Sequence, residues 1–174
     1  ECARVAVAAG AEAVVLCDTN GGHLPWDIAE ATAAVVDAVP SSIIVGVHAH
    51  DDSGVAVANS LAAVRGGACL VQGTANGVGE RTGNANLNAI IGALALKGTQ
   101  ICKEGIDVAC SDNLHLLADA ARFVDETLNL IPRKSQPYVG ASAFAHKGGL
   151  HVSALAKNSA AYEHVDPAKV GNEQ

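Results

Sequence analysis

The chain has 174 residues, of which 49% are hydrophobic and 17% are charged, so it is long enough to bury a core. Its formal net charge of −7 disfavours a nucleic-acid or anionic-membrane surface, and no apolar run approaches the roughly 20 residues of a membrane span. The five cysteines are scattered without a C-x-x-C pair, which favours reduced thiols in a cytoplasmic protein over a disulfide framework or a zinc ribbon.

The sequence reads as an internal piece of a longer protein. It contains no methionine, and it opens within an alanine-rich helical pattern over residues 1–9, which Gly10 closes. An ordinary processed N-terminus is the alternative. Taken alone, a piece of this kind is expected to be catalytically inactive.

Three times, an apolar run is followed by a polar loop and then by a helical pattern. Fully apolar runs are typical of parallel strands that are covered on both faces. Polar residues follow each run directly, where TIM barrels and doubly wound sheets place their active sites. No G-x-G-x-x-G turn follows the first strand, which favours one side of a (β/α)8 barrel over a dinucleotide-binding fold. The expected strands are 13–17, 43–47 and 69–72, and the expected helices are 25–39, 56–65 and one capped by Asn84 or Asn86 that runs to Lys97.

The pattern changes after Lys97. A helix is expected to begin at Ser111, with apolar residues at helical spacing as far as Leu128. Within this helix, Asp125 and Glu126 are interpreted as a charged face turned to solvent.

A domain boundary is expected between about residues 130 and 140. Pro132 ends the preceding helix, and the stretch 133–140 is linker-like. This division assigns residues 1–130 to the barrel and residues 131–174 to a small, mostly helical subdomain.

His48 and His50 follow the second strand with the spacing i, i+2. On a strand such residues point to the same face, so two imidazoles could chelate one divalent ion. A pair of solvated or hydrogen-bonded histidines is the alternative. Asp51 or Asp52 could orient an imidazole as a hydrogen-bond acceptor, and Gly54 allows a close turn of the backbone.

Other loops at the same end of the sheet bring oxygen donors. Histidine mixed with oxygen ligands suits an ion such as Mg, Mn, Zn or Co. The oxygen donors are Asp18, Thr19, Asn76, Glu80 and Asn84.

The glycine-rich loop 77–84 leads into a helix N-terminus and is a natural binding site for an anion, with a flexible connection as the alternative. His146 and His151 flank a glycine pair, and a surface turn is the simpler interpretation there.

The motifs HAHDDSG at 48–54 and GVGERTGN at 77–84 resemble the catalytic barrel of the 2-isopropylmalate, homocitrate and citramalate synthases. Three further segments look most like the citramalate synthase branch of that family: LCDTNGG at 16–22, AFAHKGGLH at 143–151 and the tail at 162–172. The resemblance covers nearly the whole chain in the right order.

The resemblance implies a (β/α)8 barrel whose strands six to eight are present here, followed by a small subdomain. It implies a divalent metal held by His48 and His50, with Asn84 nearby or coordinating. The family's other ligand, an aspartate beside a catalytic arginine on the first strand, is absent from this sequence. Thr19 matches the threonine that holds the carboxylate of the keto acid.

The resemblance also implies a homodimer, in which His151 assists catalysis across the interface. His151 and Glu80 are the candidates for the catalytic base. The loop that ends at Gly83 matches the acetyl-CoA side of the family's active site. Besides Thr19, the residues expected to bind substrate are Gly77, Gly79, Arg81, Gly83, Asn158 and Tyr162.

The implied activity of the whole protein is the metal-assisted condensation of acetyl-CoA with a 2-keto acid, with pyruvate and citramalate as the expected substrate and product. The same condensation on 2-ketoisovalerate or 2-oxoglutarate, by a 2-isopropylmalate or homocitrate synthase, is the nearest alternative. A lyase of related fold would share the H-x-H pattern but is not expected to carry the segment after residue 140. Two further alternatives are not enzymes: a regulatory binding function without catalysis, and an inactive metal-binding fragment.

Overall fold

The computed structural model describes residues 1–155, 157–158 and 162–173, without the side chains of Leu150, His151 and Leu155. At its centre is a parallel sheet in which each strand leads through a loop into a helix, as the repeated pattern predicted. In this described part, no helix is long and apolar enough to cross a membrane. The strands, in spatial order, are β1 (Ala13–Asp18), β2 (Ile44–Ala49) and β3 (Leu70–Gln72).

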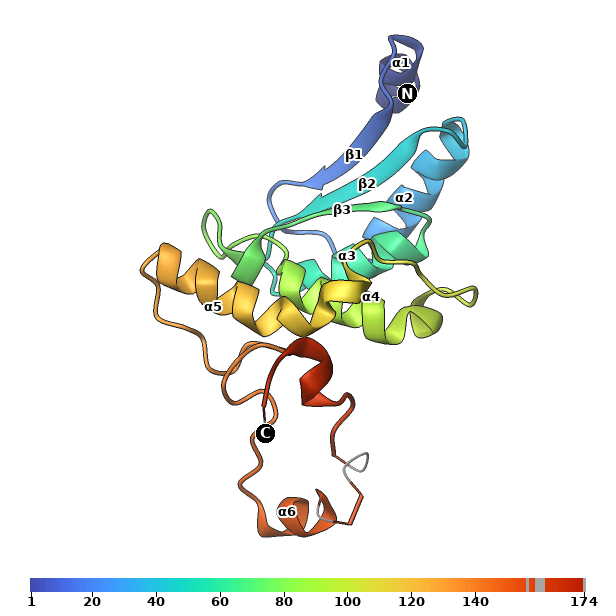
Figure 1. Cartoon of the computed structure of the whole chain (residues 1–174). Helices are drawn as coiled ribbons and strands as arrows, with labels where there is room; N and C mark the ends of the chain where they lie inside the picture. The colour runs from blue at the N-terminus through green and yellow to red at the C-terminus, as the bar shows by residue number, and fades with distance from the viewer. Residues whose placement is uncertain (156, 159–161, 174) are drawn as a thin grey trace.

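Helices pack beside the sheet, and α2 to α5 lie between residues 25 and 127 (Figure 1). The last helix of the repeat continues past Lys97 to Ile101, and the Asn86 side chain caps it by accepting from Asn88 N at 3.0 Å. The segment after Ser111 begins as a 3-10 turn. The helices are α1 (Cys2–Ala8), α2 (Pro25–Ala38), α3 (Ala56–Arg65), α4 (Leu87–Ile101), α5 (Leu117–Thr127) and α6 (Gly149–Leu155), and the 3-10 turns are η1 (Ala75–Gly77), η2 (Ser111–Leu116) and η4 (Pro167–Val170).

A buried stripe along β2 joins the sheet to its helices. Val45, Val47 and Ala49 are buried, and Val47 packs in one cluster with Ile28 of α2. Because successive side chains on a strand alternate between faces, His48 lies on the face opposite this stripe. The helices therefore cover one face of the sheet (Figure 1), and the histidine points to the other.

β1 is less covered than its sequence predicted. Ala13 and Cys17 are exposed, and within the described residues β1 pairs with β2 along one edge only. β3 likewise pairs on one side. Unpaired strand edges offer free backbone N–H and C=O groups, so this sheet can be extended on both sides.

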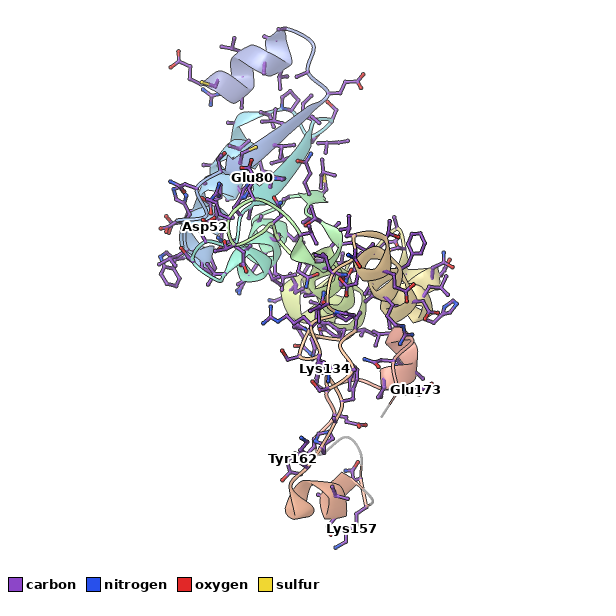
Figure 2. The ribbon with its side chains drawn as sticks, turned by 90° about the vertical axis from the view of Figure 1, so that its left-hand side faces the viewer. Asp52, Glu80, Lys134, Lys157, Tyr162 and Glu173 are labelled. Atoms are coloured by element: carbon purple, nitrogen blue, oxygen red, sulfur yellow. The ribbon has the colours of Figure 1, made fainter. Side chains whose placement is uncertain are left out.

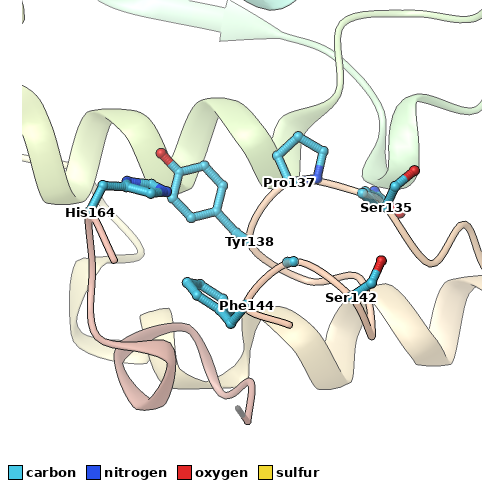
Figure 3. A pocket seen from close by; sticks show the side chains of 8 residues that line it. Ser135, Pro137, Tyr138, Ser142, Phe144 and His164 are labelled. Atoms are coloured by element: carbon cyan, nitrogen blue, oxygen red, sulfur yellow. The ribbon is translucent and has the colours of Figure 1, made fainter. Parts of the chain in front are cut away.

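The stretch 133–140, predicted to be linker-like, is folded against the helices. Gln136 and Val139 are buried, and Val139 shares a core cluster with Leu117 of α5 and Val170 of η4. The side chains of a solvated linker are exposed, whereas Gln136 and Val139 are buried, so the prediction of a linker-like stretch is wrong. Beside this stretch lies a pocket of about 340 Å³, lined by residues 135–138, 142–144 and His164 (Figure 3).

The last part of the chain contains less helix than predicted. Beyond residue 131, the helices among the described residues are α6 and the 3-10 turn η4, and irregular chain connects them (Figure 1). Pro132 and Pro137 lack the N–H that a helix needs, and Gly148 favours turns. The expectation of a mostly helical subdomain therefore fails for the described residues.

Candidate functional site

His48 and His50 lie side by side at the end of β2, as their spacing predicted. Their ring centroids are 5.2 Å apart, and the ring planes are inclined by 67°. His48 is paired in the sheet with Cys17 of β1 and Gln72 of β3. The backbone N–H of His50 donates to Asp18 O at 3.3 Å. The parallel strands thus fix the positions of both imidazoles.

Asn84 joins the histidines from the loop that follows β3. It forms an isolated antiparallel bridge with His50, and its N–H donates to Gly77 O at 3.1 Å. His50 Nδ1 and Asn84 Oδ1 are buried, and neither has a hydrogen-bond partner among the described residues. Such orphaned atoms are rare, and an imidazole nitrogen with an amide oxygen is a suitable ligand set for a divalent ion. The side chains of His48, His50 and Asn84 are therefore suitable ligands for a divalent metal ion.

The carboxylates beside the histidines have other partners than expected. Asp51 Oδ1 accepts from Ala56 N at 2.8 Å, because the free N–H groups at the start of α3 attract a carboxylate. Asp52 is bound by Arg81. The prediction that either carboxylate orients an imidazole is therefore wrong. Within the described ranges, no group of three or more His, Cys, Asp or Glu side chains could hold a metal, so this chain offers two imidazoles and an amide.

Arg81 ties the three loops at this end of the sheet together. Its Nε and Nη2 donate to the two carboxylate oxygens of Asp52 at 2.7 and 2.8 Å, and Nη2 also donates to Thr19 O at 2.8 Å. The hydrogen bonds from Arg81 lower the pKa of Asp52, and the same pair raises the pKa of Arg81. Gly21 makes room, since a Cβ there would lie 2.6 Å from Asp52 Oδ2. Bidentate pairing of this kind fixes geometry as well as charge.

Thr19 and Glu80 are both exposed on this surface. Glu80 Oε2 lies 3.8 Å from Arg81 Nη1, and 85% of the Glu80 side chain is exposed. Figure 2 shows Asp52 and Glu80 at the same end of the molecule. Both predicted residues are therefore accessible from solvent beside the histidine loop.

The loop 77–83 is shaped around Asn84 by its glycines. Gly77 and Gly83 have φ values of 72° and 107°, which glycine adopts without steric cost. A Cβ on Gly83 would collide with Gly77 O, and one on Gly79 would collide with Asn84 Nδ2. Packing and backbone conformation thus favour glycine at these positions of the loop.

Asp18 is held by a histidine for which the sequence suggested no partner. His23 Nδ1 lies 2.8 Å from Asp18 Oδ1, and the Asp18 side chain is buried while 60% of the His23 side chain is exposed. The hydrogen bond with Asp18 raises the pKa of His23. Asp18 ends β1 and His23 lies five residues further along the chain, and this closeness was the only signal available in the sequence.

Asn76, predicted among the oxygen donors of the metal site, binds α5 instead. Its Nδ2 donates to Asp125 Oδ1 at 2.7 Å and to Ala121 O at 2.9 Å, and its Oδ1 accepts from Gln136 Nε2 at 3.1 Å. Asp125 is 7% exposed, so its interpretation as part of a solvent-facing pair is wrong. Its position four residues after the buried Ala121, on the same helix face, is the signal that could have shown this.

The residues predicted from the segment after 140 lie far from the sheet end. Tyr162 is at the opposite end of the molecule from Asp52 and Glu80 (Figure 2). Lys157, which directly precedes Asn158, lies in the same distant part (Figure 2). The side chain of His151 lies outside the described residues. Within one chain, the structure therefore does not bring Asn158 or Tyr162 to the histidine loop.

Two family models match the sequence. The HMGL-like model matches residues 1–124, which include all three strands, His48, His50 and Asn84. The chain belongs to the HMGL-like family. A second model, described as homocitrate synthase post-HMGL domain-like, matches residues 138–174.

Relatives of this HMGL-like chain include curated enzymes and solved structures. An (R)-citramalate synthase of Aquifex aeolicus is 53% identical over 98% of this chain and 31% of the relative. A 2-isopropylmalate synthase of Bacillus thuringiensis is 38% identical over 100% of this chain and 34% of the relative. The structure of a Bacillus subtilis HMG-CoA lyase aligns with a TM-score of 0.60 and 24% identity, over 76% of this chain and 43% of that one, which indicates the same α/β fold. The chain thus spans about a third of the length of the curated relatives it matches.

Proposed function

We propose that the whole protein is an acetyl-CoA-dependent (R)-citramalate synthase. The observation that carries this proposal is an identity of 46–53% to (R)-citramalate synthases, against 37–39% to 2-isopropylmalate synthases, over nearly the whole chain. The difference favours pyruvate as the keto acid and isoleucine biosynthesis as the setting.

In this proposal, β1, β2 and β3 are strands six to eight of a (β/α)8 barrel to which residues 1–130 belong. Residues 131–174 begin the subdomain that follows. The parallel strand order supports this placement, as do the outer edges of β1 and β3, which pair with no other described strand, because a barrel closes only when every strand has two neighbours. The five cysteines are free, which agrees with a cytoplasmic enzyme.

His48, His50 and Asn84 would hold a divalent ion such as Mg²⁺, Mn²⁺, Zn²⁺ or Co²⁺, together with a ligand from elsewhere in the whole protein. When bound, the ion would supply Lewis-acid stabilisation of the charge that develops on the carbonyl oxygen of the keto acid. The buried, unpartnered His50 Nδ1 and Asn84 Oδ1 support this assignment.

The surrounding loops would position the two substrates. Thr19, exposed at the end of β1, would bind the carboxylate of the keto acid. The acetyl-CoA side would be formed by the loop from Gly77 through Gly79 and Arg81 to Gly83. Its close packing on Asn84 supports a role beside the reacting atoms.

Proton transfer would then start the reaction. Glu80 or His151 would remove a proton from the methyl group of acetyl-CoA. The resulting enolate carbon forms a bond to the carbonyl carbon of pyruvate, and the carbonyl oxygen gains a proton. Water cleaves the thioester, which releases the free thiol of coenzyme A and citramalate.

A homodimer would bring the α6 segment to a second active site. Tyr162, and Lys157 directly before Asn158, lie far from the sheet end of their own chain (Figure 2). Tyr162 and Asn158 could therefore act there only across an interface with a partner copy, as would His151.

Comparison of keto acids tests the proposal directly. Thiol release from acetyl-CoA by the whole protein is measured with pyruvate, 2-ketoisovalerate and 2-oxoglutarate in turn. We expect the highest kcat/KM with pyruvate and citramalate as the product. A higher kcat/KM with 2-ketoisovalerate would instead assign the protein to the 2-isopropylmalate synthases.

Replacement of the histidines tests the metal site of the same enzyme. His48→Ala and His50→Ala should each abolish metal-dependent thiol release, because each removes an imidazole ligand. Unchanged turnover in both variants would refute the proposed site.

A further inference from the structure

The side-chain amide of Asn76 uses all of its hydrogen-bonding capacity. An asparagine amide can donate two hydrogen bonds and accept two. Here Nδ2 donates to Asp125 Oδ1 and Ala121 O, while Oδ1 accepts from Asn88 Nδ2 and Gln136 Nε2. One side chain thus connects η1 to α4, to α5 and to the stretch 133–140.

The partners of Asn76 are buried. Asn88 and Gln136 are each 4% exposed, and Asp125 is 7% exposed. Inside a protein such hydrogen bonds are electrostatically stronger than in water, and a partner left unpaired is costly. The network therefore allows Asn76 little freedom to move relative to α5.

The backbone of Asn76 is specialised as well. It lies in the left-handed region at φ 59° and ψ 6°, which asparagine tolerates better than other residues with a side chain. The next residue is Gly77, whose carbonyl oxygen accepts from Asn84 N at 3.1 Å. Asn84 in turn bridges to His50. The Asp125 carboxylate is thus connected to Asn84 through one side-chain hydrogen bond, the Asn76–Gly77 backbone and one backbone hydrogen bond. The segments of Asn84 and His50 are joined by the neighbouring hydrogen bonds from Asp51 N to Gly83 O at 3.0 Å and from Ala85 N to Ala49 O at 2.9 Å.

We propose that Asn76 is a positioning residue for the metal site, and that Asp125 and Gln136 make the placement of Asn84 depend on α5 and the stretch 133–140. The inference rests on the proposed function, because it assigns a role toward the metal of that site. Gln136 directly precedes the residues that match the post-HMGL model, so a shift of that segment would reach the metal site through Asn76.

Exchanging the amide and the carboxylate between positions 76 and 125 of the whole protein tests the Asn76 hydrogen-bond network. Asn76→Asp removes both donors and places a negative charge against Asp125, so we expect Mn²⁺ affinity to fall by about 10–100-fold, the usual effect of losing a residue that orients a metal ligand. The double variant Asn76→Asp with Asp125→Asn restores that hydrogen bond with the roles reversed. It should bind Mn²⁺ at least about threefold more tightly than Asn76→Asp alone.

Thr32→Val is the matched control. Thr32 is fully buried, and its hydroxyl donates to Ile28 O of its own helix, so the variant should lower stability and leave Mn²⁺ affinity unchanged. If Asn76→Asp fails to fold, Gln136→Met removes one donor more gently and should still weaken Mn²⁺ binding by about threefold.

The possible outcomes separate the two proposals. If the wild-type protein binds no Mn²⁺ through His50, the proposed metal site itself fails. If the wild-type protein does bind Mn²⁺ through His50, but folded Asn76→Asp or Gln136→Met binds it equally well, the positioning role of Asn76 is refuted. Weaker binding by Asn76→Asp without recovery in the double variant refutes the part assigned to Asp125.

Discussion

The sheet end and the segment that follows α5 are built by different means. At the sheet end, the backbone register of three parallel strands places His48 and His50. Among the described residues beyond α5 there is little regular structure, and individual side chains hold the chain in place. Val170 is buried in the core, and Asn172 Nδ2 donates to Tyr138 O at 2.9 Å. Strand topology therefore determines the first region, whereas single contacts determine the second.

The largest expected loss of activity comes from adding a side chain to a glycine at the sheet end. A Cβ in Gly83→Ala would collide with Gly77 O and displace the loop around Asn84. We expect thiol release by the whole protein to fall about 100-fold, as for a misplacement of about 1 Å at a reacting centre. Gly10→Ala is the control, since its φ of 102° is similar but no atom lies within 4 Å of the added Cβ. Equal loss in both variants would show that backbone strain alone is responsible.

In the second region, a single core contact should matter most. Val170 is fully buried in the cluster with Leu117 and Val139. Val170→Ala should lower the free energy of local opening of α5 by about 1–2 kcal/mol, measured by hydrogen exchange in the whole protein. Unchanged exchange of the α5 amides would mean that η4 does not stabilise this helix.

The loop surface should depend on the geometry of Arg81 and not only on its charge. Arg81→Lys keeps the charge but loses the bidentate pair with Asp52, and kcat/KM for acetyl-CoA should fall about tenfold. Arg122→Lys is the control, because Arg122 pairs with Asp119 on the exposed side of α5. A similar loss in both variants would contradict a specific role for the Asp52 pair.

The smallest effect concerns the pH dependence of the Asp18–His23 pair. The hydrogen bond with Asp18 raises the pKa of His23 above its ordinary value of 6.5. The protonated ring therefore stabilises the folded state below pH 6.5, and this contribution is lost as the pH rises through the folded-state pKa. An NMR titration should give a midpoint above 6.5 in the wild type and a lower one in Asp18→Asn. Identical midpoints would argue against the pair.

Periodicity and spacing predicted what depends on local sequence. The strands and helices of the repeat, and the adjacency of His48 and His50, follow from apolar runs and the i, i+2 rule. Contacts between distant residues leave no such pattern. The hydrogen bond between Asn76 and Asp125, 49 residues apart, depends on how α5 packs. Asn76 was therefore wrongly predicted to be an oxygen donor of the metal site, and Asp125 was wrongly predicted to face solvent.

The most direct test of the account is a Co²⁺ or Mn²⁺ titration of the whole protein. His23 and His50 both extend from loops at the same end of the sheet, but His23 pairs with Asp18 while His50 Nδ1 is buried without a partner among the described residues. We predict that His50→Ala loses measurable binding and that His23→Ala keeps the wild-type affinity. Wild-type affinity in His50→Ala would contradict the metal site on which the proposed citramalate synthase activity depends.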